Sequence, residues 1–156
     1  MRIYKCPFGY TAETVAVDVV ELTPADDKPI VIFRLVMGQT TEVGDAQDEF
    51  IGTSIVRGNT TSGSGGVAAA NGNITNPSDA TSGFTYEALN TTQATSGTTK
   101  TLAQPTWCVR GGMDHVYLPE ERDEATQANT LMCWRLAGAP ADSVTMGGHV
   151  TVGENG

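Results

Sequence analysis

The sequence has little positive charge. Among its 156 residues, 9 are Lys or Arg and 18 are Asp or Glu, so the formal net charge at pH 7 is −9. Only Lys5, Lys28 and Lys100 are lysines. Binding to nucleic acid depends on clustered cations that neutralise phosphates. The charge balance therefore predicts that nucleic acid is not a partner.

Long apolar runs are also missing. No stretch approaches the roughly 18 consecutive apolar residues of a membrane span, and the N-terminal sequence MRIYKCPFGYTAETV lacks the apolar segment of a secretory signal. We therefore expect no membrane partner and synthesis in the cytoplasm. Cys6, Cys108 and Cys133 are odd in number and far apart, which is unlike a disulfide framework and predicts buried thiols.

What the chain does have favours strands. Glycine, with 18 residues, is costly inside helices, and the abundant threonines suit a pleated surface. Apolar or alternating runs predict strands at residues 14–22, 28–40, 51–57, 84–89, 102–110, 113–118, 130–136 and 145–152. About eight strands with regular turn signals predict an all-β fold, a β-sandwich that is jelly-roll-like and carries long polar loops.

The most apolar run, KPIVIFRLVMGQT at residues 28–40, predicts a central strand. Simple alternation places Val31, Phe33 and Leu35 on one face of that strand, with Ile30, Ile32 and Arg34 on the other. Residues 1–13 precede the first expected strand, so the sequence divides into an N-terminal arm at 1–13 and a single β-sandwich domain at 14–156.

Two polar segments contain few large apolar side chains, and they predict loops at residues 58–83 and 90–99. The first contains Gly63-Ser64-Gly65-Gly66. A phosphate-binding loop needs a lysine after the glycines and the start of a helix behind it, and neither is present. We therefore expect this glycine-rich stretch to be a flexible loop tip.

No side chains form a recognisable reactive set. Glu42, Asp45, Asp48 and Glu49 lack the ligand order of a calcium loop, which predicts a solvated acidic turn. His115 and His149 are the only histidines, and an enzyme such as a glycosidase or a cupin-like metalloprotein would need the fold to bring them together. We predict no catalytic, cofactor-binding or metal-binding residues and no enzymatic activity.

Several stretches, taken in order, form a recognisable series. They are QTTEVGDAQDE at residues 39–49, VRGNTTSGSGG at 56–66, NTTQA at 90–94, PEER at 119–122 and PADSVTMGG at 140–148. This series, over roughly residues 29–154, resembles a family of small structural proteins encoded by tailed bacteriophages and prophages. Membership in that family implies a virion component made in the bacterial cytoplasm.

This resemblance, together with the composition, predicts a capsid decoration (cement) protein, a homotrimer on the outer head surface that binds the major capsid protein. The apolar strands at residues 30–35, 107–109 and 131–136 offer more apolar faces than one sandwich needs, which favours self-association. The expected capsid contact is the N-terminal arm, through Arg2, Tyr4, Lys5, Phe8 and Tyr10, although the arm could instead be an edge strand of the domain. The alternative function is a head fibre, spike or tail component that binds the host surface through residues 58–83.

Overall fold

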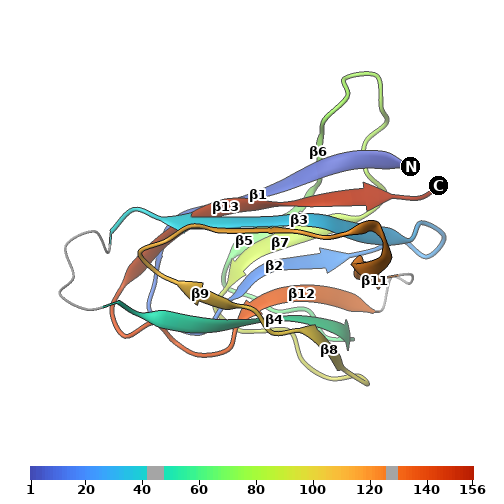
Figure 1. Cartoon of the computed structure of the whole chain (residues 1–156). Coiled ribbons are helices and arrows are strands. Elements are labelled where there is room, and N and C mark those ends of the chain that lie inside the picture. Colours follow the sequence, from blue (N-terminus) through green and yellow to red (C-terminus); the bar gives the residue numbers. More distant parts are fainter. Residues whose placement is uncertain (42–47, 126–129) are drawn as a thin grey trace.

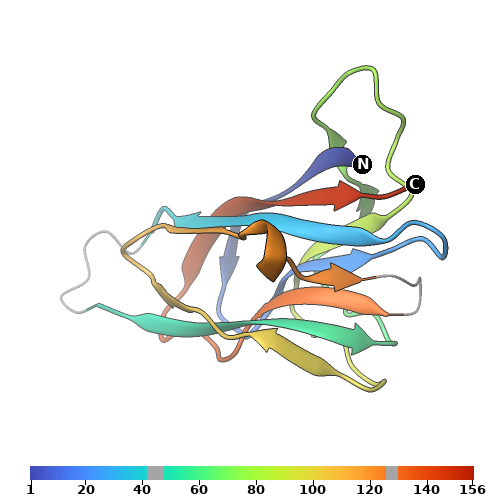
Figure 2. The same ribbon diagram turned by 45° about the vertical axis from the view of Figure 1, so that its right-hand side comes forward.

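The computed structural model describes residues 1–41, 48–125 and 130–156, and these residues form two antiparallel sheets packed face to face (Figures 1 and 2). Sheet 1 contains β1 (Arg2–Glu13), β3 (Ile30–Gln39), β6 (Asn73–Ile74), β10 (Met113–Val116), β11 (Glu124–Ala125) and β13 (Val144–Glu154). Sheet 2 contains β2 (Asp18–Thr23), β4 (Phe50–Asn59), β5 (Val67–Asn71), β7 (Thr85–Asn90), β8 (Lys100–Ala103), β9 (Thr106–Cys108) and β12 (Leu131–Leu136). The all-β sandwich predicted from the sequence is confirmed.

Strands β1 to β4 alternate between the two sheets along the chain, and so do β11 to β13, whereas β4, β5, β7, β8 and β9 all lie in sheet 2. The spatial order is β1-β13-β3-β10 in sheet 1 and β2-β12-β4-β8 in sheet 2, with β6 beside β1 and the β5-β7 pair beside β2. This alternation is compatible with the jelly-roll-like arrangement expected from the sequence. What the structure establishes is the two-sheet sandwich.

The structure has more strands than the sequence predicted. The expected strand at residues 102–110 is divided into β8 and β9. The expected loop at residues 58–83 contains β5, which pairs with β7, and β6, which pairs with β1. All residues of β5 and β6 are exposed, so these strands depend on backbone pairing and leave no hydrophobic pattern in the sequence.

Residues 2–13 are not a separate arm. Strand β1 pairs with β13 along its length, from Arg2 opposite Glu154 to Glu13 opposite Val144. It therefore lies inside sheet 1, between β13 and β6. The division expected at residue 13 is therefore corrected: residues 2–13 are part of the sandwich. Deleting this segment would remove a paired strand of sheet 1.

Two aromatic contacts tie β1 to sheet 2. The rings of Tyr4 and Phe84 meet edge to face with centroids 5.5 Å apart, and those of Phe8 and Trp134 do so at 5.9 Å. Such pairs stabilise a core beyond the area they bury. Tyr4 and Phe8 thus belong to the hydrophobic core that joins the sheets.

The faces predicted for the apolar strand at residues 28–40 are partly wrong. Along β3, Ile30, Ile32 and Leu35 are buried in the core, whereas Arg34 is exposed. Thr151 of β13 pairs with Arg34 and Val152 pairs with Ile32, so Phe33 is an extra residue at a bulge. A bulge shifts the alternation by one position, and Leu35 therefore does not share a face with Val31.

Candidate functional site

Two polar segments, residues 60–66 and 91–98, cover part of the outer face of sheet 2, and we call them the strap. They pair with each other at Thr61 and Thr95 and at Ser64 and Thr92. Beneath them, Ala94 of the strap packs with Leu131 and Cys133 of β12 in a small buried cluster separate from the main core. The surplus apolar face that the sequence assigned to residues 131–136 is thus covered by the chain itself.

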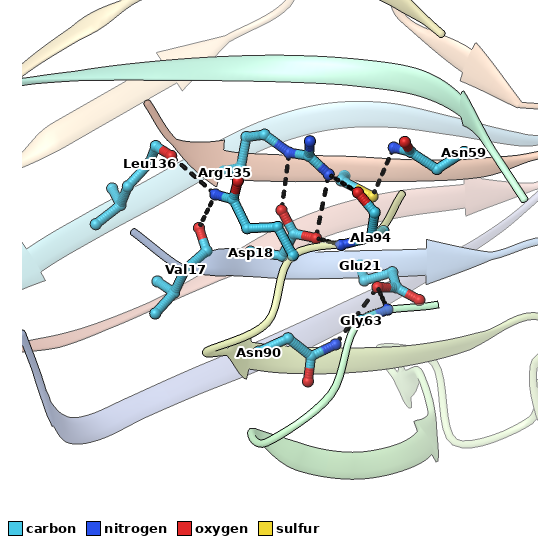
Figure 3. Close-up of polar contacts among 11 residues, drawn as sticks. Val17, Asp18, Glu21, Asn59, Gly63, Asn90, Ala94, Arg135 and Leu136 are labelled. Carbon is cyan, nitrogen blue, oxygen red and sulfur yellow. Dashed lines mark hydrogen bonds and ion pairs between the residues drawn. The ribbon is translucent and has the colours of Figure 1, made fainter. Parts of the chain in front are cut away.

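Asp18 of β2 holds one half of the strap (Figure 3). Its side chain is completely buried, and Oδ2 accepts a hydrogen bond from the backbone N–H of Ala94 at 2.6 Å. Its Oδ1 lies 2.8 Å from Nε of Arg135 on β12. Arg135 Nη2 also donates to the carbonyl oxygen of Ala94 at 3.2 Å. The ion pair thus lies between two strands of sheet 2, and both of its residues hydrogen-bond to Ala94 of the strap.

Glu21, also on β2, holds the other half of the strap. This carboxylate is 1% exposed and accepts hydrogen bonds from Ser62 Oγ at 2.6 Å and from the Gly63 N–H at 2.9 Å. Asn90 Nδ2 donates to the same carboxylate at 3.4 Å. Buried carboxylates are stable where such donors replace water. Glu21 therefore fixes the glycine-rich stretch against sheet 2.

The side-chain amide of Gln93 completes the attachment, and that of Asn59 joins β4 to β12 within sheet 2 beneath the strap. Gln93 Nε2 donates to the carbonyl oxygens of Val17, at 3.2 Å, and Leu136, at 2.9 Å. Asn59, which is 1% exposed, contacts Cys133 Sγ through Nδ2 at 3.5 Å. The strap and the sheet are thus joined by side chains from both partners.

The glycines of the strap are required by close packing. A Cβ atom on Gly63 would lie 2.4 Å from the Thr92 carbonyl oxygen, and one on Gly66 would lie 2.2 Å from that of Ala88. Both distances are far below a normal contact. The expectation of a flexible loop tip at residues 63–66 is therefore wrong, because this stretch is packed and hydrogen-bonded.

A bulge brings the two carboxylates to one face of β2. Asp18 and Glu21 are three residues apart, and regular alternation would place them on opposite faces. Trp134 pairs with Val20 and Arg135 pairs with Asp18, so Val19 is an extra residue relative to β12. This irregularity leaves no period-two signal, so the cluster could not be recognised from the sequence pattern.

The cluster could be considered as a metal site, because ligand atoms of Asp18, Glu21 and Cys133 lie within 4.8 Å of one another. Its chemistry fits an internal ion pair better. Burial raises the pKa of Asp18 to about 6, against the opposing effects of the Ala94 N–H and of Arg135. Burial also raises the pKa of Cys133 to about 12, so its thiol stays protonated at neutral pH. Arg135 supplies the cation, and the arrangement works as a tether for the strap.

The predicted contact residues are divided between the core and the surface. Tyr4 and Phe8 are buried, at 0% and 7% exposure, and this part of the prediction is corrected. They alternate along β1 with outward residues, so a partner cannot reach their rings in the folded protein. Arg2 is half-buried, Lys5 is exposed and Tyr10 is 77% exposed, which leaves these three side chains accessible.

The other candidates do not come together into a reactive set. His115 of β10 packs edge to face on Tyr117 with ring centroids 4.6 Å apart. Within the described ranges, neither His115 nor His149 belongs to a group of three potential metal ligands. All three cysteines are free, with Cys6 and Cys133 buried.

The acidic turn is only partly within the described residues. Glu42 and Asp45 lie outside them. Asp48 forms an ion pair with Arg110 at 3.2 Å, and Glu49 accepts a hydrogen bond from the Ala141 N–H at 2.6 Å.

Comparison of the chain with family models, with curated proteins and with solved structures gives no match in any of the three. In the part of the chain that the structure describes, no helix is long and apolar enough to cross a membrane.

Proposed function

We propose that the protein is a structural component of a tailed-bacteriophage virion, a capsid decoration protein that binds the outer surface of the head. The sequence resemblance motivates this proposal. The observation that carries it is that the three most buried carboxylates, those of Asp18, Glu21 and Glu154, all bind backbone or side chains of the chain's own loops. Polar groups used in this way produce a rigid module, as decoration of a shell requires.

The mechanism is stabilisation by preferential binding. A protein that binds only the assembled shell shifts the assembly equilibrium towards it, and attachment at several points increases the effect. Self-association as a homotrimer is part of the proposal. Large apolar side chains available for that contact are Phe50, Val116 and Leu118, which are 67%, 63% and 60% exposed.

The proposal is tested with heads from a phage genome in which the gene for this chain is deleted. The purified protein should co-sediment with these heads and raise the temperature at which they release DNA. Light scattering of the free protein should give three times the 16.4 kDa chain mass. A protein that leaves the heads unchanged and does not bind them contradicts the proposed function, and a monomeric mass contradicts the trimer.

A second candidate is a head-fibre, spike or tail component that binds the host surface. The favouring observation is the loop between β6 and β7, which extends beyond the sheets near the two chain ends (Figure 1). Its base is fixed by Tyr4, whose hydroxyl donates to the Ala80 carbonyl at 2.9 Å, and by Glu154, which accepts from Gly83 N at 2.6 Å. Binding of the isolated protein to host cells, without binding to heads, would favour this candidate.

A further inference from the structure

The outer face of sheet 1 differs from that of sheet 2. The strap covers part of sheet 2, whereas the central outward residues of sheet 1 remain exposed or half-buried. The strand register places Lys5, Thr151 and Arg34 in one row across β1, β13 and β3, and Pro7, His149 and Val36 in the next. We call these six residues the outer face of sheet 1.

This face carries positive charge in a protein of net charge −9. Arg34 forms an ion pair with Asp114 of β10, with a hydrogen bond of 2.7 Å from Nε. Lys5 has no ion pair within the described residues. The pKa of His149 is lowered, first by burial and then by the charges of Lys5 and Arg34, with Asp114 acting in the opposite direction. The net field at the centre of the face is therefore positive.

A groove adjoins these charges. It has a volume of about 460 Å³ and lies between Lys5, Pro7 and His149 on one side and Asn73, Ile74 and Thr75 on the other. Ile74, 41% exposed, and Pro7 supply apolar surface, while Lys5 and His149 supply hydrogen-bond donors. A groove of this kind fits a polypeptide segment that presents a carboxylate beside an apolar side chain.

We propose that the outer face of sheet 1 is the attachment surface, and that its occupant is an acidic segment of another protein, with a carboxylate seated in the groove beside Lys5. This inference rests on the proposed function only in identifying the partner as a protein of the head. Charge complementarity increases association rate and fixes orientation. It also disfavours approach through acidic parts of the surface, such as the turn with Asp26 and Asp27.

The test compares two charge reversals at exposed strand lysines. Lys5→Glu changes the proposed face, and Lys100→Glu makes the same change on β8, at the edge of sheet 2. Co-sedimentation with heads lacking the protein is measured at low and high salt. We expect Lys5→Glu to weaken binding about tenfold or more at low salt, Lys100→Glu to leave it within about twofold, and high salt to weaken wild-type binding.

Each outcome is decisive. Wild-type binding that Lys5→Glu leaves unchanged, or that Lys100→Glu removes, overturns the proposed face while the proposed function stands. Failure of the wild type to bind heads overturns the proposed function and, with it, this partner. If the wild-type protein binds a DNA oligonucleotide but not heads, and Lys5→Glu abolishes the DNA binding, the occupant of the face is not an acidic protein segment. If Lys5→Glu does not fold, Lys5→Gln takes its place with the same expected direction.

Discussion

Oδ1 of Asp18 lies 2.8 Å from Nε of Arg135, and Asp18 is completely buried while the Arg135 side chain is 16% exposed. The pair joins adjacent strands of sheet 2, and both residues also bind Ala94 of the strap. Burying two opposite charges costs desolvation free energy, and their mutual attraction and hydrogen bonds offset that cost. Removing one partner is therefore more damaging than removing an exposed ion pair.

Replacement of Arg135 tests this relationship. Arg135→Ala leaves a buried carboxylate without its cation, and we expect the free energy of unfolding to fall by about 3–5 kcal/mol. Arg34→Ala, which removes an exposed ion pair with Asp114, is the matched control and should have a much smaller effect. Urea denaturation measures both. Equal losses in the two variants would mean that the buried pair contributes no more than a surface one.

The raised pKa of Asp18 predicts a pH dependence. Its pKa is about 6 in the folded protein and near its ordinary value of 3.8 in the unfolded chain, so the folded state binds the proton more tightly. The contribution of this group to stability is therefore full below about pH 4 and is lost as the pH rises to about 6. The stability of wild type relative to Asp18→Asn should fall across this range in urea denaturation. A relative stability that rises instead would contradict the shift.

The sequence predicted the fold where burial is regular. The runs at residues 28–40 and 130–136 have apolar side chains that two sheets can bury, and both form strands as expected. The strand β1 was expected only as the alternative to a free arm, because Pro7 and Gly9 interrupt a run in which Tyr4 and Phe8 alternate with outward residues. Pro7 has no backbone N–H to donate to a neighbouring strand. The backbone groups of the odd-numbered residues near it point away from β13, as the Ile3 carbonyl does when it accepts a hydrogen bond from Thr75 N, so Pro7 removes no hydrogen bond to β13.

The strap and its cluster could not be predicted in this way. Bulges at Val19 and Phe33 change the side-chain alternation of β2 and β3, and a period-two pattern cannot represent them. The partners of Asp18 include Arg135, 117 residues away in the sequence. Contacts over such separations follow from the topology of the sandwich, which a local pattern does not contain. The polar composition of the strap, taken alone, predicts a free loop.

Alanine at Gly66 should loosen the strap. The new Cβ would lie 2.2 Å from the Ala88 carbonyl oxygen, so backbone must move, at a cost of about 1–3 kcal/mol. Gly138→Ala is the control, because nothing lies within 4 Å of a Cβ there. Thermal unfolding gives the stability change, and hydrogen exchange at the Thr92 and Thr95 amides reports the strap itself. Unchanged exchange in Gly66→Ala would show that the strap does not need this close approach.

The titration of His149 tests the electrostatics of the outer face of sheet 1. Its pKa should lie below the ordinary 6.5, because of burial and the charges of Lys5 and Arg34. Lys5→Ala removes one of these charges and should raise the pKa, whereas Asp114→Asn removes a compensating negative charge and should lower it further. NMR of the His149 ring across pH 4–8 measures all three proteins. Shifts in the reverse directions would contradict the positive field at this face.

Two replacements within residues 58–83 separate its free part from its packed part. Exchange of residues 76–79 for Gly-Gly removes only the tip of the projecting loop, keeps the Tyr4 contact to Ala80, and should cost about 1 kcal/mol or less. Exchange of residues 61–82 for a short Gly/Ser linker removes half of the strap together with β5 and β6, and leaves Glu21 buried without Ser62 and Gly63. We expect the second change to lower the unfolding midpoint by more than about 10 °C, and the first by a few degrees at most. Circular dichroism measures both midpoints, and similar midpoints for the two variants would mean that the strap contributes little to the stability of the sandwich.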